Sequence, residues 1–123
     1  MAVTLVLDTN VILYLLASKL AEPLPVVSYY ASVITRMELL SYPRISPEEE
    51  QRVRSLLSTI TVVALDHYIE LAAIRLRRTY SLKLADAIIA AIVVVLGMEL
   101  ATNDRRLANI PELTIRQLRL IED

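Results

Sequence analysis

The first constraint on the fold is an abrupt change of pattern near the N-terminus, where a strand-like run ends at a carboxylate and a helical pattern begins. Residues 3–7 are apolar apart from Thr4 and partly β-branched, which is typical of a strand buried on both faces. Asp8 follows directly, and an apolar helix capped by Thr9 or Asn10 is expected to run to about residue 17. Such a junction places Asp8 at the carboxyl edge of a sheet, where α/β proteins bind ligands.

The same alternation of short apolar strands and helices repeats along the chain. Further strands are expected over residues 26–33, 59–65, 99–102 and 113–118, the last at a sheet edge. Helices are expected over residues 34–42, 47–57, 67–80 and 84–96, with a short one between 103 and 111. Strands that alternate with helices are joined by right-handed crossovers, so the sequence predicts an α/β fold. Its central, mainly parallel β-sheet should have four to five short strands, with helices on both faces.

Three helix ends are marked by local signals. Ser46 and Glu49 have the spacing of a capping box, and Asp66 is placed to cap the helix that follows it. Gly97, the only glycine, is placed to end the most apolar helix.

Composition limits the class of protein. A chain of 123 residues with 55% hydrophobic content is sufficient for one core, so a single domain over residues 1–123 is expected. The absence of cysteine excludes disulfides and thiolate chemistry and agrees with a cytoplasmic location. No signal peptide is recognisable, and the apolar run at residues 87–96 is about half the length that crosses a bilayer. No membrane partner is therefore expected.

With a net charge of −1, the protein lacks the excess of basic residues found in many nucleic-acid-binding proteins. A nucleic acid would therefore have to be bound by local groups of arginines. A run of arginines on a helix is more often a solvated face. The candidates for contacts to an RNA backbone are Arg36, Arg75, Arg77, Arg78, Arg105 and Arg106.

Four acids fall at the end of a predicted strand or in the first turns of a predicted helix, namely Asp8, Glu38, Asp86 and Asp104. In a parallel sheet these positions share one edge. Carboxylates about 4 Å apart repel by about 4 kcal/mol per pair at an effective dielectric of about 20, so such a cluster needs a cation or shared protons. Oxygen ligands alone favour Mg²⁺ or Mn²⁺, which activates water and neutralises a phosphodiester. The neighbours that could orient these ligands or position water are Thr9, Asn10, Thr102 and Asn103.

Each acid also has a local structural interpretation. Asp8 could shape the strand exit as an Asx turn, and Thr35 with Glu38 has the form of a capping box. Asp104 could be a first-turn acid of a surface helix. For Asp86 the helix dipole contributes only about 0.3–1 kcal/mol, less than the cost of an unpaired buried carboxylate. The four polar neighbours could likewise be helix caps.

The four motifs, in this order, resemble those of the PIN-domain family, and most closely those of the VapC-type toxin ribonucleases. They are Leu7-Asp8-Thr9-Asn10, Thr35-x-x-Glu38-Leu39-Leu40, Leu84-Ala85-Asp86-Ala87-Ile88-Ile89-Ala90-Ala91 and Ala101-Thr102-Asn103-Asp104. The resemblance covers almost the whole chain and implies a single PIN-like domain with metal-dependent endoribonuclease activity. In it, Asp8, Glu38, Asp86 and Asp104 match the acidic quartet, and Asn10 and Thr102 match nearby polar positions.

The resemblance also implies a homodimer and, for toxin members, a cognate antitoxin that inserts a segment over the active-site groove. Two features depart from the family. Residues 19–25 form a short connection where similar toxins often carry a further helix that contributes to antitoxin binding. Leu107 lies in a region where the family often has an aromatic residue.

Other functions are compatible with parts of the pattern. A PIN fold could serve as a housekeeping RNA-processing nuclease or as a catalytically silent RNA-binding module. A Mg²⁺-dependent phosphatase with an aspartate nucleophile usually has a second acid at the position of Asn10. A receiver-like signalling domain needs an acceptor aspartate on a central strand, for which Asp66 is the candidate, and a late lysine, whereas Lys83 is the last lysine here.

Overall fold

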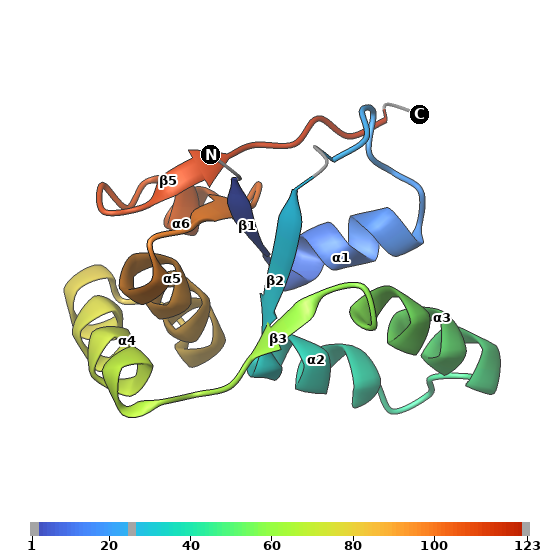
Figure 1. The fold of residues 1–123 in the computed structure, drawn as a ribbon, viewed down its shortest axis with the longest axis horizontal. Coiled ribbons are helices and arrows are strands. Elements are labelled where there is room, and N and C mark those ends of the chain that lie inside the picture. The colour runs from blue at the N-terminus through green and yellow to red at the C-terminus, as the bar shows by residue number, and fades with distance from the viewer. Residues whose placement is uncertain (1–2, 25–26, 122–123) are drawn as a thin grey trace.

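The computed structural model describes residues 3–24 and 27–121 and contains a five-stranded sheet in the order β3-β2-β1-β4-β5 (Figure 1). All four pairs of neighbouring strands are parallel. The strands are β1 (Thr4–Leu7), β2 (Ser28–Ser32), β3 (Thr61–Val63), β4 (Glu99–Ala101) and β5 (Thr114–Arg116). The predicted parallel α/β sheet is confirmed, as is the edge position of the last strand.

The strands are shorter than predicted because neighbouring helices and turns take up their ends. Val33 begins a helix instead of extending β2, and the predicted start of that strand at residue 26 lies outside the described residues. Before β3, the N–H groups of Thr59 and Ile60 bond to the carbonyls of Leu56 and Leu57 at 3.0 and 3.1 Å. These two residues therefore complete the preceding helix end and do not pair in the sheet.

The described residues form six helices: α1 (Thr9–Leu16), α2 (Val33–Leu40), α3 (Pro47–Leu57), α4 (His67–Tyr80), α5 (Leu84–Leu96) and α6 (Arg105–Ala108). The capping box of Ser46 and Glu49 is confirmed, with hydrogen bonds of 3.1 and 3.3 Å. Asp66 caps α4 by accepting from the Ile69 N–H. Gly97 ends α5 in the left-handed conformation with φ of 65°, as its position predicts.

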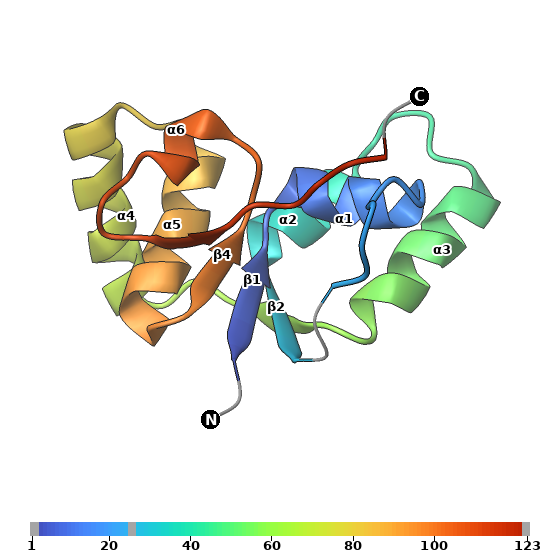
Figure 2. The same cartoon turned by 90° about the horizontal axis from the view of Figure 1, so that it is seen from above.

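Helices cover both faces of the sheet, with α4, α5 and α6 on one side and α1, α2 and α3 on the other (Figure 2). Successive strand residues point to opposite faces, so Val6 and Leu100 pack with α5, whereas Leu5 and Leu7 pack with α1. Seven consecutive residues of α5, from 87 to 93, are buried. The α4–α5 layer thus fixes the start of α5 relative to the sheet.

No single helix in the described ranges is long and apolar enough to span a membrane, and only α4 and α5 together, bent by 119°, pass a test of length and composition.

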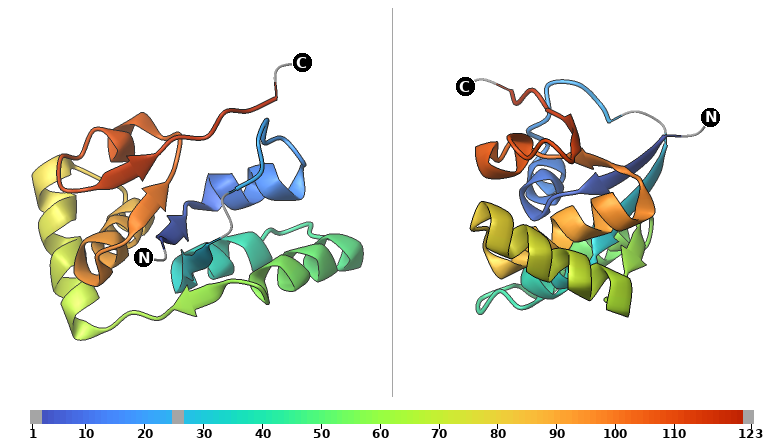
Figure 3. Two further views of the ribbon diagram at one scale, coloured as in Figure 1. Left: turned by 45° about the horizontal axis from the view of Figure 1, so that its top comes forward. Right: turned by 90° about the vertical axis from the view of Figure 1, so that its left-hand side faces the viewer.

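After β5, the chain crosses to the connection that follows α1 (Figure 3). Leu20 and Leu120 form an isolated antiparallel bridge, and the Ile121 N–H donates to the Lys19 carbonyl at 2.8 Å. Between α1 and β2 the described residues contain no further helix, which agrees with the short connection expected there.

Candidate active site

Asp8 lies at the carboxyl end of β1, where it is 5% exposed and serves as the N-cap residue of α1. Its N–H donates to the Ala101 carbonyl at 3.2 Å, which extends the pairing of β1 with β4. Its Oδ2 accepts a hydrogen bond of 2.7 Å from Thr102 Oγ1. The prediction that Thr9 or Asn10 caps α1 is wrong, because β1 continues to Leu7 and the helix starts at Thr9 itself.

Burial is the main cause that raises the pKa of Asp8, and the carboxylate of Asp104 raises it further. The Thr102 hydroxyl and the first backbone N–H groups of α1 act in the opposite direction. The fold therefore holds this carboxylate in a site that disfavours its charge, with the Thr102 hydrogen bond as its main compensation.

Asp86 lies in the first turn of α5, as predicted, and is partly buried. Desolvation is the largest cause that raises its pKa, followed by repulsion from Asp8, Asp104 and, more weakly, Glu38, while Lys83 opposes the shift. Within the described part of the chain its carboxylate accepts no hydrogen bond. The other three acids therefore all lie near enough to act on Asp86 at one edge of the sheet.

Glu38 is held toward α1 by a hydrogen bond of 2.9 Å from Thr9 Oγ1 to its Oε1. Thr35, fully buried in α2, lies 2.9 Å from the same threonine oxygen, and it must be the donor because Thr9 gives its only hydroxyl proton to Glu38. The interpretation of Thr35 and Glu38 as a capping box is wrong. Ser32 caps α2 instead, with its side chain accepting from the Ile34 N–H at 3.0 Å.

Asp104 lies just before the first turn of α6, where it has a capping role in place of the first-turn position suggested by the sequence. It is the N-cap residue of α6, and its Oδ1 accepts from the Arg106 N–H at 2.9 Å. Its own N–H donates to Thr102 Oγ1 at 3.0 Å. The hydroxyl of Thr102 thus links Asp104 to Asp8.

The four polar neighbours of the acids divide into two pairs. Thr9 and Thr102 bond directly to Glu38 and Asp8. Asn10 is exposed, and Asn103 uses its amide group on the backbone of the C-terminal tail, so neither side chain bonds to an acid among the described residues. The amide of Asn103 contacts a residue 15 positions further along the chain, for which the local sequence gives no signal.

The donor set fits a hard divalent ion in its chemistry, because it consists of carboxylates whose repulsion a cation would relieve. As placed, no three acidic or histidine side chains among residues 3–24 and 27–121 are close enough to hold one ion together. Asp8 is fixed by its buried hydrogen bond, whereas Glu38 is exposed and is held by its hydrogen bond from Thr9. Binding of an ion by three or more of these carboxylates would therefore require the side chains of Glu38, Asp86 or Asp104 to move toward Asp8.

Arg75 differs from the other arginines proposed for RNA contacts. Its guanidinium forms hydrogen bonds of 2.7 and 3.2 Å to both carboxylate oxygens of Glu112, which also accepts from the Tyr80 hydroxyl at 2.8 Å. This pairing lowers the pKa of Glu112 and ties α4 to the segment before β5. The remaining predicted contacts, all exposed, are Arg36, Arg77, Arg78, Arg105 and Arg106.

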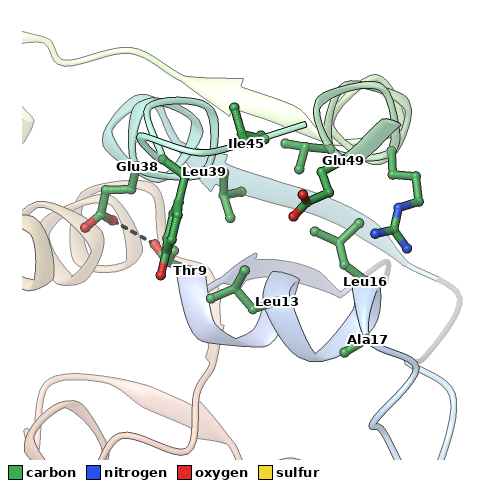
Figure 4. A pocket seen from close by; sticks show the side chains of 11 residues that line it. Thr9, Leu13, Leu16, Ala17, Glu38, Leu39, Ile45 and Glu49 are labelled. Carbon is green, nitrogen blue, oxygen red and sulfur yellow. Dashed lines mark hydrogen bonds between the residues drawn. The ribbon is translucent and has the colours of Figure 1, made fainter. Parts of the chain in front are cut away.

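A groove of about 460 Å³ between α1, α2 and α3 opens next to the acids (Figure 4). Thr9 and Glu38 lie at one end, joined by their hydrogen bond, and Glu49 lies at the other. Leu13 and Leu39 are among the apolar side chains that line it between them.

The sequence matches the PIN-domain family over residues 5–113. The chain belongs to the PIN-domain family. The resemblance of its four motifs to this family is thereby confirmed, and the matched range contains all four acids. PIN domains are typically nucleases and generally bind divalent metals.

Solved structures with this PIN fold include components of toxin–antitoxin complexes. A chain of a toxin–antitoxin complex from Klebsiella pneumoniae is 31% identical with a TM-score of 0.74, over 89% of this chain and 94% of that one. A DNA-bound VapBC from Salmonella typhimurium is 22% identical with a TM-score of 0.77, over 94% and 98% of the two chains. VapBC2 from Rickettsia felis, bound to a promoter DNA fragment, is 18% identical with a TM-score of 0.76, over 94% and 99%. A search of curated protein sequences gives no significant match.

Proposed function

We propose that this PIN-domain protein is a Mg²⁺- or Mn²⁺-dependent endoribonuclease that hydrolyses RNA phosphodiester bonds and acts as the toxin of a toxin–antitoxin pair. The observation that carries the proposal is that Asp8, Glu38 and Asp104 lie around Asp86 at one sheet edge and all raise its pKa. A carboxyl group whose pKa is raised by neighbouring carboxylates lies in a site that gains stability when a cation binds.

Each residue has a distinct part in this mechanism. Asp8 is the fixed ligand, because burial and Thr102 hold its position. Asp86 and Asp104 complete the carboxylate set, and a bound ion would neutralise phosphodiester charge and lower the pKa of the attacking water. Glu38 Oε1 accepts from Thr9, which leaves Oε2 at the exposed rim of the site to accept a proton from that water.

RNA is the proposed substrate, and the exposed arginines are the proposed contacts to its backbone. Arg105 and Arg106 follow Asp104 directly on α6, so they lie beside the acids. Arg36 is two residues before Glu38 on α2, and Arg78 is in the last turn of α4. These positive charges offset the slightly acidic net charge of the protein near the site.

The proposed protein partners are a cognate antitoxin and a second copy of the chain, in a cytoplasmic setting. The similar Klebsiella pneumoniae chain comes from a toxin–antitoxin complex. An apolar antitoxin segment in the groove that begins at Glu38 would cover the exposed side of the active site. For the homodimer, α4 presents the exposed apolar side chains of Tyr68, Leu71 and Ile74.

The sheet order argues against a receiver-like domain. Asp66, the candidate acceptor, follows β3, which is an edge strand, and its carboxylate caps α4. At the position where an aspartate-nucleophile phosphatase has its second acid, the chain has Asn10, whose exposed side chain bonds to none of the described acids. A housekeeping nuclease would share the proposed chemistry and differ in its RNA and partners.

The proposal is tested by incubating the purified protein with structured and unstructured RNAs in Mn²⁺ or Mg²⁺. Cleavage should stop in EDTA and fall at least about 100-fold in Asp8→Asn, equivalent to about 2.7 kcal/mol of transition-state stabilisation. Glu48→Gln, which removes an exposed carboxylate on α3, is the matched control and should cleave like the wild type. Cleavage at the wild-type rate both in EDTA and in Asp8→Asn would disprove the metal mechanism.

A further inference from the structure

We propose that Asn103 is a positioning residue, which fixes the loop that carries Asp104 by hydrogen bonding to the backbone near the C-terminus. This inference rests on the proposed metal-dependent function. The C-terminal tail is residues 117–121, and the acidic loop is residues 102–104. Two hydrogen bonds join them, both through the side-chain amide of Asn103.

The Asn103 side chain replaces a pair of backbone hydrogen bonds. Nδ2 donates to the Leu118 carbonyl at 2.8 Å, and the Leu118 N–H donates to Oδ1 at 2.8 Å. The regular pairing of β4 with β5 ends at Ala101 and Arg116, followed by a longer bond of 3.3 Å from the Thr102 N–H to the Arg116 carbonyl. The amide group therefore continues the contact between the two segments after the strands have ended.

The two neighbours of Asn103 hold the acids. Thr102 Oγ1 donates to Asp8 at 2.7 Å and accepts from the Asp104 N–H at 3.0 Å. Asp104 in turn caps α6. Since Asn103 is the residue between them, a displacement of its backbone would alter both the hydrogen bond to Asp8 and the position of Asp104. Displacements of about 1 Å are sufficient to impair ligand geometry in an active site.

The C-terminal tail is anchored to the rest of the fold, so it can hold the acidic loop in place. Leu118 packs at the edge of the α1–α3 core, and the Ala21 N–H donates to the Arg119 carbonyl at 2.8 Å. Arg119 also pairs with Glu22 at 2.8 Å, an exposed contact. The tail thus connects the acidic loop to the far end of α1, whose first turn carries Thr9 (Figure 2).

Hydrogen bonds between a loop and a tail would also be present if Asn103 served stability alone. A stabilising residue lowers the melting temperature when it is replaced, but it leaves the metal affinity of the folded protein unchanged. A positioning residue changes the metal affinity and the protection of the Asp104 N–H. Replacement of residues that orient metal ligands typically costs 10–100-fold in affinity.

The test compares variants of the full chain by Mn²⁺ titration calorimetry and by amide hydrogen exchange in EDTA, at a temperature where each variant is folded. Asn103→Ala should weaken Mn²⁺ binding by about tenfold or more and accelerate exchange of the Asp104 N–H. Asn109→Ala, the same change at the exposed end of α6, should do neither. Arg119→Ala, which removes only the exposed ion pair of the tail, is the second control and should retain wild-type affinity.

A chain that ends at Gln117 removes Leu118 while leaving Asn103 intact, and should match Asn103→Ala in both measurements. It decides the question if Asn103→Ala does not fold. Mn²⁺ affinity within about twofold of wild type in the folded variants, with unchanged Asp104 exchange, would overturn the inference. A wild-type protein without Asp8-dependent Mn²⁺ binding would overturn the proposed function instead, and exchange of the Asp104 N–H would still report whether the two Asn103 hydrogen bonds order the loop.

Discussion

Replacement of Thr102 by valine isolates the hydrogen bonds that link Asp8 to Asp104. Thr102 is fully buried, and its hydroxyl makes one bond of 2.7 Å to a carboxylate and accepts another of 3.0 Å from an N–H. Valine has nearly the same shape, so the change removes the hydroxyl without creating a cavity. A hydrogen bond to a charged group is worth about 1.5–3 kcal/mol, and an unsatisfied buried N–H costs about 1–3 kcal/mol.

Thr102→Val should therefore lower the free energy of unfolding by about 3 kcal/mol near neutral pH, which corresponds to a fall in Tm of about 12 °C. Thr102→Ser keeps both hydrogen bonds and loses one methyl group, so it should lose only about 1 kcal/mol. Because the hydroxyl lowers the pKa of Asp8, its removal raises that pKa further. The deficit of Thr102→Val should therefore grow as pH rises through the pKa of Asp8 in the folded protein.

Urea unfolding followed by circular dichroism in EDTA, at acidic and neutral pH, measures both effects. The serine variant controls for the loss of side-chain volume. A valine variant as stable as the serine variant at neutral pH, or a deficit that shrinks as pH rises, would refute the reasoning about this hydroxyl.

Three further predictions concern the charged groups. Asp86→Asn should raise the Tm of the protein in EDTA by a few degrees in calorimetry, since it removes repulsion with Asp8, and a clear fall in Tm would indicate a structural role for that carboxylate. The raised pKa values of Asp8 and Asp86 give stability that is present below the ordinary carboxyl pKa of 3.8 and is lost as pH rises through the folded values. The Tm of the wild type in EDTA should fall over that window, and a Tm that rises throughout it would contradict the assignment. Glu112→Gln should lower the Tm by at most about 4 °C, because the contacts of Glu112 with Arg75 and Tyr80 are exposed. A tenfold change in Mn²⁺ affinity would show that these contacts affect the active site.

Local signals predicted much of the fold because the structures they mark are local. Ser46 and Glu49 are three residues apart, Asp66 caps the helix that follows it, and Gly97 ends α5 where its backbone freedom is needed. The alternation of strands and helices was sufficient to predict a parallel sheet, because right-handed crossover connections leave few other topologies. Once the sheet was predicted, its carboxyl edge was the region in which the acids were expected.

Contacts between distant residues were not predictable in this way. Thr9 and Glu38 are 29 residues apart, and their hydrogen bond depends on the packing of α1 against α2. The capping-box pattern of Thr35 and Glu38 was misleading because Ser32 begins the helix earlier. The amide of Asn103 reaches Leu118 only because β5 lies beside β4. In each case tertiary packing determined which partner a polar side chain received.

The central claim is that a divalent ion binds among the four acids with Asp8 as its fixed ligand. Anomalous scattering from a crystal of this protein soaked in Mn²⁺ tests it most directly. The strongest peak should lie about 2 Å from a carboxylate oxygen of Asp8 and within reach of Asp86 and Asp104, and it should disappear in Asp8→Asn. Strong Mn²⁺ peaks found only elsewhere, such as at the exposed acids in the first turn of α3, would contradict the account.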